Sequence, residues 1–153
     1  KLLYRRAKEV LPAGDGVVPI GKAAVRRPGR HLTIVSYGAM VPLALDGAAD
    51  LAKEGVEAEV VDLRTLLPLD EETVLASVRK TSRCILLYED ARTLGIGAEI
   101  SATIAEKAFE WLDAPIVRVT APDTPVPFAP ALEAAYLPGL STLLAAARKL
   151  AAY

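Results

Sequence analysis

The chain alternates short, almost continuously apolar runs with longer stretches in which apolar residues recur at helical spacing. β-Branched and apolar runs at residues 31–37, 58–63, 84–88 and 115–119 predict four strands. Apolar residues three or four positions apart predict helices within residues 41–52, 74–78, 100–112 and 140–151. Strands that are apolar on both faces and alternate with helices favour a mainly parallel sheet with helices on both sides. We therefore predict a three-layer α/β/α domain of the α/β class.

The predicted boundaries rest on glycine, proline and capping residues. Gly55 is expected to end the first helix, and Asp70 is expected to cap the second, whose acidic first turn suits the positive end of a helix. Scattered glycines and prolines without a sustained period predict a linker arm over residues 1–30. The α/β domain is then expected to cover residues 31–153. The chain starts at Lys1 without an initiator methionine and looks like a piece of a longer protein.

Composition narrows the function further. The 153 residues are 52% hydrophobic, carry a formal net charge of −1 and suffice for one domain with a single core. Such a charge disfavours binding to nucleic acid or to an anionic membrane. No apolar stretch approaches the roughly 20 residues that span a bilayer. We expect a soluble protein, in the cytoplasm of a bacterium or in the mitochondrial matrix of a eukaryote.

The residue types that most often carry chemistry are scarce. The only cysteine, Cys84, lies in an apolar run and is expected to be a buried, reduced thiol rather than a nucleophile. The only histidine, His31, is a possible general base but is expected in an exposed loop. One cysteine and one histidine about fifty residues apart do not give the spacing of a zinc site, and no calcium-type loop is present. We predict neither a catalytic set nor a metal site within this chain.

In open α/β sheets, ligands bind beyond the carboxyl ends of the strands. The sequence places Gly38, residues 62–65, 89–90 and 120–124 at such ends. Gly95 and Gly97, at a helix start, could cradle a phosphate on free amides, but the third glycine of a dinucleotide fingerprint is missing. Glu89 and Asp90 could form an acid/base pair, although adjacent carboxylates at a strand end more often cap or face solvent.

Two further segments indicate surface contacts. Lys22, Arg26, Arg27 and Arg30 form a small basic cluster, which is expected to be a solvated loop rather than a nucleic-acid site. The proline-dense stretch 123–130 resembles a polyproline ligand, but its apolar Val126 and Phe128 favour an ordered loop at the domain edge or at an interface. We favour the interface.

Several motifs, in this order, resemble the C-terminal domain of 2-oxo acid dehydrogenase E1 β subunits, within the wider transketolase C-terminal domain family. The resemblance covers essentially the whole chain, and the combination is more specific than any one piece. Features near residues 112–116 and at the end of the chain resemble branched-chain enzymes, whereas residues 121–124 also resemble pyruvate enzymes. The matching pieces are residues 20–23, 32–38, 62–70, 77–83, 95–100 and 123–127.

The resemblance implies a non-catalytic assembly domain. In such a family the complete β subunit has a further N-terminal domain and joins an α subunit in an α2β2 heterotetramer. Thiamine diphosphate and magnesium would act in those missing parts, where a 2-oxo acid is decarboxylated and its acyl group passes to the lipoyl arm of E2. We therefore expect no cofactor on this domain alone, which would be inactive. Its partners would be the E1 α subunit, a second β subunit and the E2 subunit-binding domain.

The resemblance also suggests interface residues. Family members bind E2 through acidic groups and the C-terminal carboxylate of the β subunit, which points to Asp113 and Tyr153. Val126 and Phe128 would lie in subunit contacts, and Glu89 matches a family position. Relatives often carry His-Glu where this chain has Tyr88-Glu89, so any role of that histidine is lost here. A stand-alone small-molecule or nucleotide-binding domain, or a regulatory metabolite-binding domain, remains the alternative.

Overall fold

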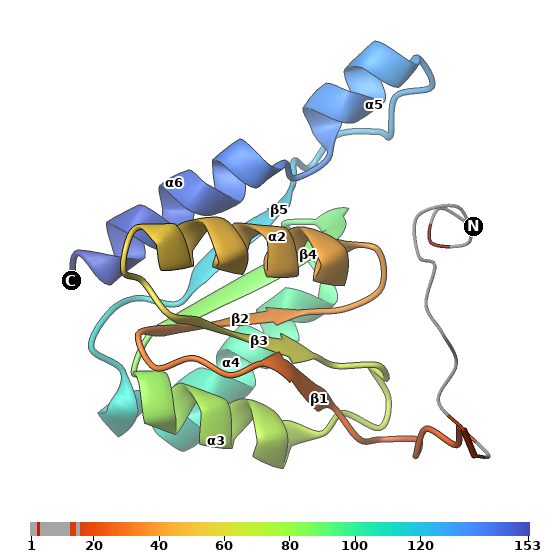
Figure 1. Ribbon diagram of the computed structural model, residues 1–153. Helices are drawn as coiled ribbons and strands as arrows, with labels where there is room; N and C mark the ends of the chain where they lie inside the picture. The colour runs from red at the N-terminus through yellow and green to blue at the C-terminus, as the bar shows by residue number, and fades with distance from the viewer. Residues whose placement is uncertain (1–2, 4–12, 15) are drawn as a thin grey trace.

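A five-stranded sheet with the strand order β1-β3-β2-β4-β5 forms the centre of the protein (Figure 1). The computed structural model describes residues 3, 13–14 and 16–153. Strands β2 to β5 pair in parallel, whereas β1 runs antiparallel to β3 at one edge. The sheet is therefore mainly parallel, as predicted. Its strands are β1 (Ala24–Arg27), β2 (Leu32–Ser36), β3 (Ala58–Asp62), β4 (Cys84–Ala91) and β5 (Val117–Ala121).

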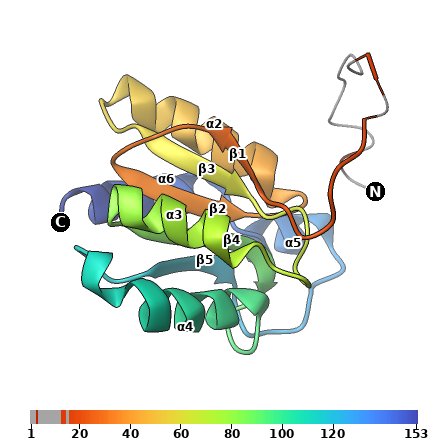
Figure 2. The ribbon, with the colours of Figure 1, turned by 90° about the horizontal axis from the view of Figure 1, so that it is seen from below.

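Helices cover both faces of the sheet, which confirms the three-layer prediction (Figures 1 and 2). Successive residues of a strand point to opposite faces, so Ile34 packs in the core beneath α2 and α6, whereas Val35 packs in the core beneath α3 and α4. None of the described helices has the length and apolar run needed to cross a membrane. The helices are α2 (Met40–Lys53), α3 (Glu71–Thr81), α4 (Ile96–Ala108), α5 (Pro130–Tyr136) and α6 (Leu140–Ala151), with a 3-10 turn, η1 (Phe109–Trp111).

The sheet begins earlier in the chain than the sequence predicted. Strand β1 lies inside the segment expected to be a linker arm, and its Val25 pairs with Val61 of β3. The prediction was wrong here because four residues with exposed positions in the middle give no measurable alternation. Residues 1–2, 4–12 and 15 of the predicted arm lie outside the described residues.

Side-chain hydrogen bonds fasten this first segment to the domain. The amide of Gly21 donates to Thr65 Oγ1 at 3.0 Å, and the amide of Ala23 donates to Asp70 Oδ2 at 3.1 Å. Arg27 donates to the carbonyl oxygens of Ala48 and Ala58, at 3.0 and 3.1 Å, and pairs with Glu57. Arg27 is therefore not part of a solvated basic loop, whereas Lys22, Arg26 and Arg30 are exposed, as expected.

The local signals for the helices are largely confirmed. Asp70 caps α3 and accepts a hydrogen bond from the amide of Thr73 at 3.3 Å. Burial raises the pKa of Asp70, but hydrogen bonds from Thr73 and Ala23 outweigh this effect and hold it below its usual value. Gly55 follows α2 with a φ of +84°.

Cys84 is fully buried, and burial raises the pKa of its thiol to about 12, as expected for a structural cysteine.

A buried carboxylate connects α3 to the sheet. Glu59, on β3, is almost fully buried and accepts hydrogen bonds from Ser77 Oγ and Lys80 Nζ. The amide of Gly29 also donates to it at 3.3 Å. Because each carboxylate oxygen has a donor, this charge is tolerated inside the domain.

Candidate functional site

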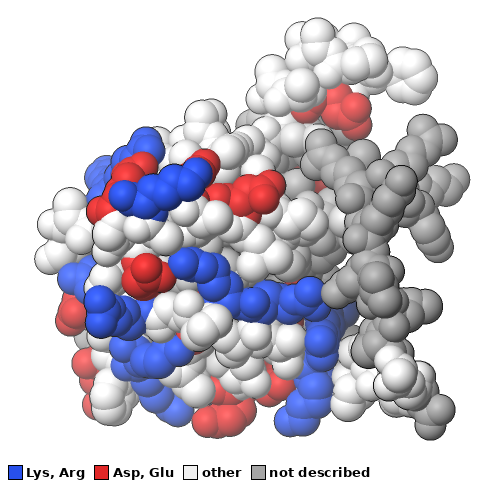
Figure 3. Space-filling view, viewed as in Figure 1, with Lys and Arg blue, Asp and Glu red and all other residues white. Residues whose placement is uncertain are grey.

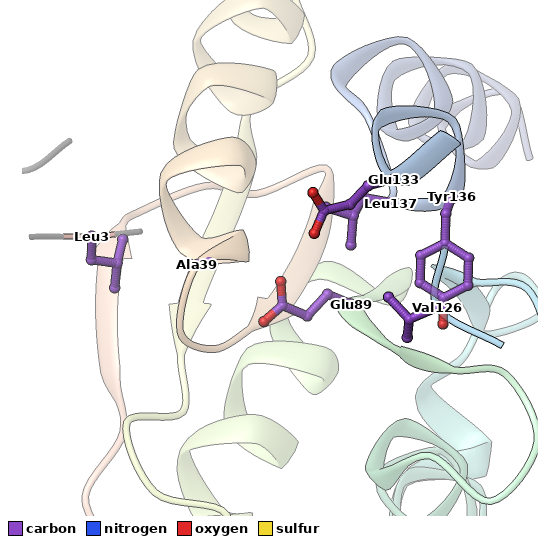
Figure 4. A pocket seen from close by; sticks show the side chains of 7 residues that line it. All are labelled: Leu3, Ala39, Glu89, Val126, Glu133, Tyr136 and Leu137. Atoms are coloured by element: carbon purple, nitrogen blue, oxygen red, sulfur yellow. The ribbon is translucent and has the colours of Figure 1, made fainter. Parts of the chain in front are cut away.

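The carboxyl ends of the strands surround a cavity of about 560 Å³. Glu89 reaches it from β4, and Ala39 reaches it from the turn before α2 (Figure 4). Val126 lies in the segment after β5, and Glu133, Tyr136 and Leu137 belong to α5 or follow it. Leu3 completes the wall. The structure thus brings two predicted residues, Glu89 and Val126, to one site.

Helix α5 projects from the body of the protein beside this cavity (Figure 1). The sequence analysis did not predict this helix, and none of its seven residues is buried. Its surface is almost entirely uncharged in Figure 3, since Glu133 is its only charged residue. Leu132 is 60% exposed, Val126 is 67% exposed and Phe128 is fully exposed. The apolar side chains of the proline-dense segment therefore stay largely exposed on this domain.

The cavity has an acidic side. Glu89 and Asp90 are both exposed at the end of β4. In Figure 4 the carboxylates of Glu89 and Glu133 extend into the same space. Tyr37 follows β2 and lies near these carboxylates. The pKa of its hydroxyl is raised mainly by partial burial and, to a smaller extent, by the negative charges of Asp90 and Glu89. The carboxylates at this cavity would suit a cationic group and oppose an anion.

Gly95 and Gly97 have a packing role that the sequence analysis missed. A methyl group on Gly97 would lie 2.0 Å from Cε1 of Tyr88 and 2.8 Å from its hydroxyl oxygen. A methyl group on Gly95 would lie 2.3 Å from the Ala91 carbonyl oxygen and 3.4 Å from Asp90 Oδ2. The glycines therefore allow α4 to approach the buried Tyr88 ring, and the nearby carboxylate disfavours a phosphate.

Hydrogen bonds also connect the segments that follow β4 and β5 at the carboxyl edge of the sheet. Asp123 accepts hydrogen bonds from the amide and hydroxyl of Thr93, at 2.8 and 2.7 Å. These bonds lower the pKa of Asp123. Arg118 donates to the carbonyl oxygen of Arg92 at 2.9 Å. Because these contacts join the segment after β4 to β5 and to the segment that follows it, Arg118 and Asp123 order the loop that precedes α4.

The remaining two predicted interface residues lie at the opposite end, where β5 begins. Tyr153 is 63% exposed and lines a cleft of about 270 Å³ with Pro115 and Val117 on one side and α6 on the other. Asp113 is exposed, two positions before Pro115, and lies 3.8 Å from Arg83 Nη1. The five candidates therefore form two groups, with Phe128 close in sequence to Val126.

The remaining candidates are accounted for by local structure. His31 is half-buried, and its Nδ1 accepts a hydrogen bond from the amide of Glu57 at 2.8 Å, so the expected exposed loop is wrong. Glu57 follows α2 and lies 26 residues from His31 in the sequence, so the residues next to His31 give no sign of this contact. Within residues 3, 13–14 and 16–153, no group of three or more His, Cys, Asp or Glu side chains is arranged to hold a metal ion.

Sequence comparisons identify the relatives of this chain. A family model described as the C-terminal domain of transketolase matches residues 21–152. The chain is 50% identical to the β subunit of acetoin:2,6-dichlorophenolindophenol oxidoreductase from Cupriavidus necator, over 97% of the chain and 44% of that protein. Identity to the β subunit of the Bacillus subtilis pyruvate dehydrogenase E1 component is 46%, over 96% and 45%. Identity to the B. subtilis 2-oxoisovalerate dehydrogenase β subunit is 42%, over 100% and 47%.

Comparison with solved structures finds a similar fold. The fold is similar to a split-gene transketolase, described as an inactive β4 tetramer, with a TM-score of 0.77 and 28% identity. That match covers 94% of this chain and 46% of the other. The chain therefore spans about half the length of the relatives that it matches.

Proposed function

The chain belongs to the transketolase C-terminal domain family, and we propose that it is the assembly domain of the β subunit of a thiamine-diphosphate-dependent 2-oxo acid dehydrogenase. The names of two relatives, a pyruvate dehydrogenase and a 2-oxoisovalerate dehydrogenase β subunit, support this assignment. Acetoin, pyruvate and 2-oxoisovalerate enzymes are matched at 50%, 46% and 42% identity, so identity alone does not select the substrate. The complete enzyme would oxidatively decarboxylate a 2-oxo acid and transfer the acyl group to lipoyl-E2.

One observation carries the assembly role. The segment from Val126 to Leu137 leaves apolar side chains in solvent and contributes no buried residue from α5. Exposed apolar surface of this kind marks an interaction site, because its burial stabilises a complex by about 25 cal/mol for each Å² removed from water. The E1 α subunit and a second β subunit are the partners that would cover Val126 and Phe128.

The opposite end of the domain suits E2 docking. The cleft beside Tyr153 has mainly apolar walls and is also lined by Lys149, and Asp113 lies two positions before Pro115 of this cleft. An exposed carboxylate and an apolar cleft at the same end of the domain would suit a partner with basic and apolar groups. We assign this end to the E2 subunit-binding domain.

The residues present do not fit the diphosphate of the cofactor. At the start of α4, Asp90 approaches Gly95, and Glu89 and Asp123 add further negative charge to the same edge. Carboxylates disfavour a bound diphosphate, because like charges repel at short range. We therefore place thiamine diphosphate and magnesium in the other parts of the enzyme and derive no chemical step through them here.

Calorimetric titration tests this assignment. The chain should give no binding heat with thiamine diphosphate and magnesium, but should bind the E2 subunit-binding domain. Asp113→Asn should weaken E2 binding, whereas the same change at the exposed Asp46 on α2 should not. Clear binding of the cofactor would overturn the assignment and favour a small-molecule-binding domain.

A further inference from the structure

An apolar cleft lies between α6 and the start of β5, at the end of the domain away from α5 (Figure 1). Strand β5 is the edge strand of the sheet, so no further strand covers this side. The volume of the cleft is about 270 Å³, near the lower limit of roughly 300 Å³ for small-molecule sites. A ligand that fills it is therefore small. The lining residues are Pro115, Val117, Ala146, Lys149, Leu150 and Tyr153.

Lys149 gives this cleft a positive charge. It is exposed and forms no ion pair with another residue in the part of the chain that the structure describes. The adjacent Arg148 pairs instead with Glu54, which follows α2. None of the residues that line the cleft is acidic. A lysine at the rim of an apolar cleft lays its stem on the wall and keeps its ammonium in water, where it attracts an anion.

Asp113, the exposed acidic residue at this end, has a cation of its own. Its carboxylate lies 3.8 Å from Arg83 Nη1, so part of its charge is offset there and not at Lys149. The other polar side chain of the cleft is Tyr153. Its amide donates to the carbonyl oxygen of Leu150 at 3.3 Å, which turns the end of the chain back towards α6. Among the residues that line the cleft, the Tyr153 hydroxyl and the Lys149 ammonium are the side-chain hydrogen-bond donors.

We propose that this cleft binds a small amphiphilic carboxylate, with its aliphatic tail between α6 and β5 and its carboxylate at Lys149 and Tyr153. Apolar walls with few polar groups are typical of small-molecule sites, and a single cation selects an anionic head group. Because the same end of the domain is assigned to the E2 subunit-binding domain, the bound carboxylate competes with E2 and regulates assembly. The competition rests on the proposed function, whereas the binding site itself does not.

Titration of the chain with straight-chain carboxylates, followed by two-dimensional NMR of the backbone amides, tests the site. Hexanoate should shift the amide signals of Val117, Ala146 and Tyr153. From butyrate to hexanoate, each added methylene should tighten binding up to about fourfold, because the methylene is removed from water. Hexanol lacks the charge and should bind at least about fivefold more weakly than hexanoate, and hexylamine should bind more weakly still because Lys149 repels it.

Two variants, each with a matched control on α6, test the walls and the charge. Ala146→Phe fills the cleft and should raise the dissociation constant for hexanoate at least about tenfold. Ala145→Phe should not, because Ala145 is exposed and does not line the cleft. Lys149→Met should abolish the preference for hexanoate over hexanol, whereas Arg148→Met should keep it.

Three results would overturn the site: no amide shift at the highest soluble concentration of hexanoate, unchanged binding in Ala146→Phe, or hexanol binding as tightly as hexanoate. Calorimetric titration with the E2 subunit-binding domain separates this inference from the assembly role. Saturating hexanoate should raise the E2 dissociation constant, and an unaltered value would overturn the competition. E2 binding without hexanoate binding would sink the site and leave the assembly role standing. Hexanoate binding without E2 binding would do the reverse.

Discussion

The contact between α4 and Tyr88 predicts an unusual sign for a glycine substitution. Gly97 lies at the second position of α4, where alanine would ordinarily favour the helix by up to about 1 kcal/mol. Here its methyl group would lie 2.0 Å from Tyr88 Cε1, which is far inside van der Waals contact. Overpacking of a well-packed core costs about 1–3 kcal/mol. We therefore expect Gly97→Ala to lower the free energy of unfolding, as measured by urea denaturation.

Substitutions of Tyr88 separate the clash from other causes. Tyr88→Phe keeps the ring and removes a buried hydroxyl that has no hydrogen-bond partner among the described residues. It should be neutral or stabilising alone, and it should leave the Gly97→Ala penalty in place. Tyr88→Leu removes the ring edge, so the penalty should shrink towards zero in that background. Gly139→Ala is the control, since nothing lies within 4 Å of its added methyl group. An equal penalty in the Phe and Leu backgrounds would refute the reasoning.

Three further predictions concern buried polar groups. Asp70→Ala should cost about 1 kcal/mol at pH 7 through loss of the cap of α3. The folded-state pKa of Asp70 is lowered, so its contribution is present above the unfolded value of about 3.9. It is lost as pH falls through the folded value, and a wild-type advantage that grows in acid would contradict this. Lys80→Met should cost about 1–3 kcal/mol because it leaves Glu59 buried without its cation, discounted for the half-exposed lysine. Arg148→Met removes one partner of the exposed pair with Glu54 and should destabilise the protein less than Lys80→Met. Equal losses of stability for the two variants in urea denaturation would show that burial of Glu59 is not the cause. Cys84, with its pKa raised to about 12, should resist iodoacetamide at pH 8 until the chain is unfolded; rapid labelling of the native chain, followed by mass spectrometry, would show the thiol to be accessible.

The strands and their faces could be predicted because their signals are local. Ile34 and Val35 are both apolar, and both are buried, on opposite sides of β2. A parallel strand covered on both faces requires this pattern, which gives the layer architecture directly. Asp70 and Gly55 likewise act on their own helices, so their positions in the sequence suffice to assign them.

Edge and surface elements could not be predicted in the same way. Strand β1 is identified by hydrogen bonds to β3, more than thirty residues away, and not by its own composition. The role of Gly97 is set by the Tyr88 ring, which belongs to another element. Because the sequence does not show that contact, the two glycines at the helix start indicated a possible phosphate site and not a packing role. Helix α5 lacks a buried face, and therefore lacks the periodic apolar stripe by which the other helices were found.

Tyr88 and Glu89 show how the core and the proposed subunit contact beside α5 are joined. Adjacent residues of a strand point to opposite faces, so the Tyr88 ring packs against α4 while the Glu89 carboxylate enters the cavity beside α5. The position of β4 is set by the packing of Tyr88, and Glu89 can move only with it. A change at Glu89 should therefore alter association alone, whereas a change in the size of residue 88 should alter stability and association together. The end of β4 is thus the point at which the fold determines the geometry of assembly.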